Sequence, residues 1–86
     1  MPNPAYQNNL RQTLVTGASP ETFTNVGIML IYNSGLIDGA IVAQVSGDDN
    51  LPIPAGTYIS LPSIAPNVYA AIVLNANGST LNVYWL

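Results

Sequence analysis

The chain has 86 residues, the size of a single domain, and a net charge of −3 from one Arg and four acidic residues. One arginine and no lysine cannot neutralise a row of phosphates, so the composition argues against binding to nucleic acid or to an anionic membrane surface. Because cysteine and histidine are absent, there are no disulfides, no thiolate ligands and none of the usual zinc ligands or general bases, and we expect no metal site, no cofactor and no catalytic site.

The low charge also bears on assembly. Charged residues make up 6% of the chain and hydrophobic residues 49%, whereas an ordinary soluble domain carries about 25% charged residues. A domain of this size buries only roughly 63% of the surface that its unfolded chain exposes. These features favour a chain packed against other chains, and we expect a homo-oligomer. The alternative is that neutral polar groups keep a monomer soluble.

The first segment, residues 1–9 (MPNPAYQNN), is expected to be an extended N-terminal arm. Its two prolines favour extended backbone, and its polar residues cannot form a core. We expect Tyr6 and the rest of the arm to contact a neighbouring chain. The segment lacks the basic region and apolar core of a signal peptide.

Residues 10–86 are expected to form one domain of strands. In chain order, the six stretches with alternating or β-branched residues are 10–16, 23–32, 36–46, 55–61, 68–75 and 80–86. Gly27 and Gly39 interrupt the second and third stretches, as glycines do at bulges or close backbone approaches. The aliphatic positions of 28–32 and 68–74 are expected to supply the core. The stretch 68–75 is so apolar that both its faces are expected to be covered.

The last stretch shows the clearest alternation. Leu81, Val83 and Trp85 fall on one face of residues 80–86, and Thr80, Asn82 and Tyr84 fall on the other. Short strands separated by turn signals, with no capped helical pattern, predict an all-β fold. We expect a single antiparallel β-sandwich or jelly-roll-like barrel of six to eight short strands.

Prolines and turn residues punctuate the second half of the chain. Proline lacks the N–H that a central strand donates, so these residues belong at strand ends or sheet edges: Pro52, Pro54, Pro62 and Pro66. Asn77-Gly78-Ser79 matches a glycosylation acceptor, but Asn-Gly between two strands predicts a hairpin turn in the primed conformation. Asp48-Asp49-Asn50 has oxygens for calcium, but it lacks the calcium-loop pattern and is expected to be a solvated turn.

No reacting group stands out among the remaining polar residues. The four carboxylates are expected to be scattered surface charge rather than an acid–base pair, and no histidine is present to activate a serine. The aromatic residues allow two interpretations, a sugar-binding face or core packing with subunit contacts: Tyr6, Tyr32, Tyr58, Tyr69, Tyr84 and Trp85. Arg11 either anchors a carboxylate across an interface or faces solvent. The candidate interface residues are Pro2, Pro4, Tyr6, Arg11, Tyr84 and Leu86.

The C-terminal half resembles the ends of small β-sandwich virion proteins of tailed bacteriophages. The matching elements, in chain order, are Pro54-Ala55-Gly56, Leu61-Pro62, Pro66-Asn67-Val68-Tyr69, Asn77-Gly78 and the final strand from Leu81 to Leu86. The resemblance implies a non-enzymatic structural protein on a capsid surface, neck or tail, and within that class we expect a capsid decoration or cement protein. It also implies a homo-oligomer, often a trimer, with the major capsid protein and other virion proteins as partners. The alternative is a carbohydrate- or receptor-binding β module of a tail or neck component.

Overall fold

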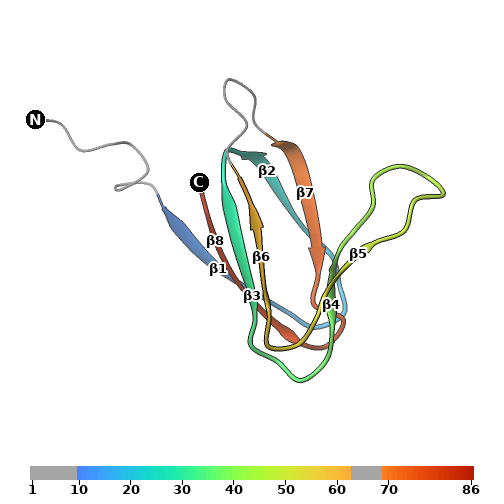
Figure 1. The fold of residues 1–86 in the computed structure, drawn as a ribbon. Helices are drawn as coiled ribbons and strands as arrows, with labels where there is room; N and C mark the ends of the chain where they lie inside the picture. The colour runs from blue at the N-terminus through green and yellow to red at the C-terminus, as the bar shows by residue number, and fades with distance from the viewer. Residues whose placement is uncertain (1–9, 63–68) are drawn as a thin grey trace, which may run out of the picture.

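The fold is an antiparallel β-sandwich (Figure 1), seen in a computed structural model that describes residues 10–62 and 69–86. One sheet has the strand order β1-β8-β3-β6, and the other has the order β2-β7-β4-β5. This confirms the predicted all-β class, and no helix occurs in the described residues, so none there could cross a membrane. The predicted arm, residues 1–9, and Pro66 lie outside the described residues. The eight strands are β1 (Arg11–Thr16), β2 (Glu21–Val26), β3 (Met29–Asn33), β4 (Gly39–Ile41), β5 (Leu51–Ile53), β6 (Tyr58–Leu61), β7 (Tyr69–Asn75) and β8 (Thr80–Trp85).

The prediction of one strand over residues 23–32 is wrong, because β2 and β3 belong to different sheets. The chain crosses between the sheets at Gly27, where the close backbone approach expected of this glycine does occur. The Gly27 and Ile28 N–H groups both donate to the Leu86 carbonyl, at 2.6 and 3.2 Å. A Cβ on residue 27 would lie 3.4 Å from that same oxygen, an ordinary contact distance, so the close approach is made by the backbone groups.

The strand predicted over residues 36–46 is also wrong in extent, since only β4 forms there. Beyond Ile41 the chain makes one more backbone bond to β7, from the Val42 N–H to the Val73 carbonyl at 2.8 Å. The next N–H, of Ala43, donates instead to the side-chain oxygen of Asn50 at 2.8 Å. A side chain in the following loop therefore takes over a donor that a longer strand would have used.

The three described prolines of this set lie at strand ends or sheet edges, as expected. The strand β5, which was not predicted, contains Pro52 and forms the edge of its sheet, where a missing N–H costs no ladder bond. The strand β6 forms the edge of the other sheet, and Pro54 and Pro62 stand on either side of it. The turn before β6 is longer than predicted, because Gly56 has a φ of +77° and the strand begins at Tyr58.

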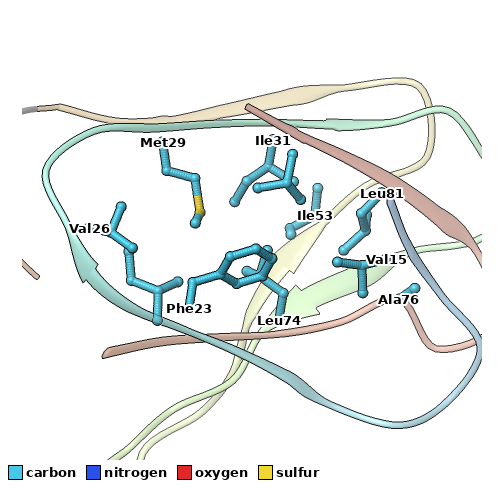
Figure 2. Close-up of a cluster of buried hydrophobic side chains, with 11 residues drawn as sticks. Val15, Phe23, Val26, Met29, Ile31, Ile53, Leu74, Ala76 and Leu81 are labelled. Carbon is cyan, nitrogen blue, oxygen red and sulfur yellow. The ribbon is translucent and has the colours of Figure 1, made fainter. Parts of the chain in front are cut away.

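The core lies between the two sheets (Figure 2). The predicted alternation of β8 is confirmed, with Leu81 and Val83 buried and Tyr84 exposed on the opposite face. Of the aliphatic residues expected in the core, Ile28 and Leu30 are exposed, because the pleat of β3 points only alternate residues inward. The buried apolar residues are Val15, Phe23, Val26, Met29, Ile31, Ala40, Ile53, Ile72, Leu74, Ala76, Leu81 and Val83.

The turn between β7 and β8 has the predicted primed conformation. Asn77 and Gly78 both have positive φ, +53° and +87°, and the Ser79 N–H donates to the Ala76 carbonyl at 2.8 Å. The predicted hairpin is wrong, however, because β7 and β8 enter different sheets after this turn. The turn therefore joins the two layers of the sandwich at one end.

A buried polar cluster that the sequence did not predict ties that end together. The Asn33 side chain is 0% exposed, and its amide nitrogen donates to the carbonyls of Ile37 and Ile53 at 2.9 and 2.8 Å. Its amide oxygen accepts from the Gly35 N–H at 3.0 Å and from the Ser79 hydroxyl at 2.7 Å. The Asn33 side chain forms four hydrogen bonds, two as donor and two as acceptor. It therefore joins β3, β5 and the β7–β8 turn without leaving a buried polar atom of its own unpaired.

Candidate interaction surface

The outward side of the β1-β8-β3-β6 sheet brings three tyrosines together: Tyr32, Tyr58 and Tyr84. Because Leu81 and Val83 point into the core, the other residues of β8 point outward, and so do their partners in β1 and β3. The register then places two rows of four residues side by side. We call the surface formed by these eight residues the tyrosine face: Gln12, Tyr84, Leu30 and Ser60 in one row, and Leu14, Asn82, Tyr32 and Tyr58 in the next.

Several side chains of the tyrosine face contact one another or a neighbouring residue. The rings of Tyr32 and Tyr58 lie 4.7 Å apart between centroids, tilted by 32°. The amide nitrogen of Gln12 donates to the Tyr84 hydroxyl at 3.5 Å, and that of Asn82 donates to the Ser34 hydroxyl at 2.7 Å. Large apolar groups remain accessible, with Tyr58 65% exposed. The face therefore combines aromatic rings, aliphatic side chains and neutral hydrogen-bonding groups in an ordered array.

The charged residues all lie away from the broad faces of the sandwich. Arg11 and Glu21 are the first residues of their strands, and Asp38, Asp48 and Asp49 lie in the loops around β4. The outward side of β2 and β7 carries uncharged side chains, since Thr22 pairs with Val73 and Thr24 with Ala71. Each sheet thus presents a neutral outer face, and the charges occupy strand ends and loops.

The described residues cover the two sides of strand β7 to different extents. Ile72 and Leu74 are buried in the core, whereas Ala71 and Val73, which point to the opposite side, are half-buried. The prediction that both faces of this strand are covered therefore holds only in part within the described residues, since the outward face is half-buried. The apolar outer side of β7 adds to the neutral surface of its sheet.

The predicted interface residues do not come together in one place. Tyr84 lies on the tyrosine face, while the Leu86 N–H and carbonyl bond to the backbone at Gly27 and Ile28. The guanidinium of Arg11 lies 5.3 Å from the centre of the Trp85 ring, a cation–π arrangement. Pro2, Pro4 and Tyr6 lie outside the described residues.

Trp85 sits at the rim of the core rather than on the tyrosine face. Its ring meets Phe23 edge to face, with centroids 5.3 Å apart, and its indole N–H donates to the Thr13 hydroxyl at 3.2 Å. Tyr69 is also away from the face, in β7, and its hydroxyl donates to the Pro62 carbonyl at 3.1 Å. Of the six aromatic residues weighed for a sugar-binding face, three lie together on one surface: Tyr32, Tyr58 and Tyr84.

Sequence reasoning missed Leu14 and Leu30 as surface residues, and it did not group them with the tyrosines. The alternation of each strand could have indicated that they point outward, because each leucine is adjacent in sequence to a core residue. Leu14 lies beside Val15, and Leu30 lies between Met29 and Ile31. Placing these leucines beside the tyrosines required the strand order β1-β8-β3-β6, which brings together strands from the two ends and the middle of the chain.

The carboxylates show structural contacts. A carboxylate oxygen of Asp38 accepts from the Ala55 N–H at 3.1 Å. Asp48 and Asp49 are exposed, but the turn lies earlier than predicted, at residues 45–48, where the Asp48 N–H donates to the Val45 carbonyl at 3.1 Å. Across residues 10–62 and 69–86, no group of three or more His, Cys, Asp or Glu side chains is placed to hold a metal ion. Comparison of the chain with protein-family models, with curated proteins and with solved structures gave no match.

Proposed function

We propose that this chain is a non-enzymatic structural protein of a phage virion, a capsid decoration or cement protein that stabilises the particle through shape and apolar contacts. The observation that carries the proposal is that the charged residues lie away from the broad outer faces of the two sheets. Both outer faces of the sandwich are neutral, and all five charged residues stand at strand ends or in loops. Such faces can be covered by another protein without removing an ion from water, a step that costs several kcal/mol per unpaired charge.

The tyrosine face has the side chains that protein interfaces favour. Tyrosine is enriched at interface centres and charged residues are depleted there, and the face follows both tendencies. Leu14 is 57% exposed and Tyr58 is 65% exposed, so substantial apolar area is available for burial. The partners proposed for these surfaces are further copies of this chain and the major capsid protein.

The resemblance to phage virion proteins falls on definite elements of the fold. Pro54-Ala55-Gly56 forms the turn between β5 and β6, Leu61-Pro62 ends β6, and Asn77-Gly78 forms the turn into β8. These elements set where the edge strand and the final strand of the tyrosine face begin. The resemblance supports the proposal through features that shape the candidate surface.

Mass spectrometry of purified phage particles tests the proposed role. We expect the chain to be present in a fixed number of copies per particle, in the hundreds for a coat on the capsid surface. A dozen copies or fewer would assign it to a neck or tail component instead. Absence of the chain from every particle whose genome encodes it would contradict the proposed role.

A second candidate function is recognition of a neutral carbohydrate by the tyrosine face. The observation that favours it is the grouping of Tyr32, Tyr58 and Tyr84 beside the amides of Gln12 and Asn82. Aromatic rings pack on the apolar sides of sugars, and amides bond to hydroxyl groups. The absence of charge on the face suits an uncharged glycan.

A glycan array separates the two candidate functions. If the face binds sugar, we expect selective binding that the variant Tyr58→Ala weakens about tenfold or more, the loss of about 1.4 kcal/mol of contact. The matched control is Leu51→Ala, which removes an exposed side chain from the other sheet and is expected to leave binding unchanged. A chain that binds no glycan on the array contradicts this second candidate.

A further inference from the structure

The four edge strands of the sandwich differ in how they are protected against pairing with another chain. Unprotected edges pair readily, and proteins block them with proline, charge, bulges or short length. Of the three protected edges, β5 has three residues and contains Pro52, β6 is bracketed by Pro54 and Pro62, and β2 is distorted at Asn25, where φ is +54°. The remaining edge, β1, has six residues and contains neither proline nor glycine.

The strand β1 is regular and open on its outer edge. It pairs with β8 without interruption from Arg11 to Thr16, and it is the terminal strand in the order β1-β8-β3-β6. Four of its six residues are exposed. In the part of the chain that the structure describes, no strand pairs with its second edge, so the backbone N–H and C=O groups on that side are available for a new strand.

We propose that two copies of this chain pair through β1 in antiparallel register, with Leu14 opposite Leu14 of the second copy. An antiparallel strand is complementary to a second copy of itself, because each donor then meets an acceptor. The pairing joins the two four-stranded sheets into one sheet of eight strands. It extends the tyrosine face across both copies, because paired residues in a ladder point to the same side.

The register follows from the side chains of β1. Leu14 points outward and is 57% exposed, whereas Val15 points into the core. The two-residue period of a strand requires outward residues to meet outward residues, and centring the pair on Leu14 brings together the two largest apolar groups of the edge.

Charge permits this register. Arg11 is the only charged residue in β1, and in this pairing it lies opposite Gly17 of the second copy. The two guanidinium groups are then six residues apart along the ladder, about 20 Å at the rise of a strand, so they do not repel each other strongly. No carboxylate of β1 is brought into the interface, since the strand has none.

Disulfide cross-linking tests the register. The chain has no cysteine, so Leu14→Cys introduces a single thiol at the proposed twofold axis. Mild oxidation is expected to convert this variant to a covalent dimer that a reducing agent separates. The matched control is Ser60→Cys, an outward residue of the opposite edge strand β6, which is expected to stay monomeric on a non-reducing gel. Equal cross-linking of the two variants, or none at Leu14→Cys, overturns the proposed register.

Sedimentation equilibrium of the unmodified chain tests the assembly itself. We expect twice the chain mass of 9.1 kDa, and a shift to the single-chain mass in Leu14→Lys, which places two like charges opposite each other. The control Thr24→Lys adds the same charge to β2 and is expected to remain dimeric. A thermal unfolding curve of each variant checks that it is folded.

A single-chain or threefold mass for the unmodified chain overturns the β1 pairing, as does a Leu14→Lys variant that stays dimeric. A threefold mass would leave the proposed virion role standing, because that role is tested by the content of particles and not by the mass of the free chain.

Discussion

Replacing Asn33 by leucine is expected to lower the free energy of unfolding by about 3–5 kcal/mol, because each buried group left without a partner costs about 1–3 kcal/mol. The change removes the partner of four groups, of which the Ile53 carbonyl and the Ser79 hydroxyl are in fully buried bonds, and the Ile37 carbonyl and the Gly35 N–H, in partly buried bonds, cost less. Since Asn33 is 0% exposed, water cannot replace the amide without rearrangement. The loss is a large share of the roughly 5–15 kcal/mol that stabilises a typical domain.

Urea unfolding followed by circular dichroism measures this effect. The control is Asn82→Ala, which removes a single side-chain bond, to the exposed Ser34 hydroxyl, and is expected to cost about 1 kcal/mol or less. The variant Asn33→Asp keeps the shape but loses both donated bonds, and it is expected to destabilise the fold by a similar amount to leucine. If Asn33→Leu costs no more than Asn82→Ala, the amide does not hold the two sheets together at that end.

Replacing Leu81 by alanine is expected to cost about 2–5 kcal/mol, the range measured for leucine-to-alanine changes in protein cores. Leu81 is fully buried at the start of β8, opposite Val15 of β1 and Asn33 of β3. A Cβ on Gly39 would lie 3.0 Å from one of its methyl groups, so the leucine packs closely against the backbone of the facing sheet. Truncation leaves a cavity that this backbone cannot easily fill.

The matched control for this prediction is Leu30→Ala, in the strand beside β8. Leu30 points outward and is 38% exposed, so its truncation is expected to cost about 1 kcal/mol or less. The two variants remove the same atoms from adjacent strands, and denaturant unfolding measures the difference between them. If Leu30→Ala lowers the free energy of unfolding as much as Leu81→Ala or more, the assignment of Leu81 to the inner face and Leu30 to the outer face of the sheet is contradicted.

Local signals in the sequence predicted part of this fold. The alternation of Leu81, Val83 and Trp85 reports which face of β8 is buried, because one strand in one sheet keeps a two-residue period. Asn77-Gly78 adopts the positive φ angles that its composition favours. The prolines mark sheet edges through the donor that they lack, a property of the residue itself.

Other features depend on contacts between distant residues, and the sequence did not predict them. Residues 23–32 look like one strand because β2 and β3 are both rich in β-forming residues, and only the Leu86 carbonyl, which caps the corner at Gly27, shows where they separate. Asparagine is a common turn residue, so the sequence does not mark Asn33 as buried. Its role in joining the two sheets depends on Ile53 and Ser79, which are 20 and 46 residues away in the chain.

The candidate surface was predicted only in outline. The number of tyrosines suggested a sugar-binding face or core packing with subunit contacts, and Tyr84 was placed on the face of its strand opposite Leu81, Val83 and Trp85. Bringing Tyr84 beside Tyr32 and Tyr58 required the strand order β8-β3-β6, which joins the end of the chain to its middle. Strand order is set by the packing of the whole domain rather than by any local pattern.

The retention of the chain on purified particles at different salt concentrations tests most directly the claim that its neutral faces attach it to a virion. Salt at about 1 M reduces the screening length to about 3 Å and weakens ion pairs, whereas apolar contacts do not weaken. With five charged residues, all outside the broad faces, the chain is expected to remain bound equally after washing at low salt and at about 1 M salt. Retention at low salt with release at high salt would contradict attachment through neutral faces.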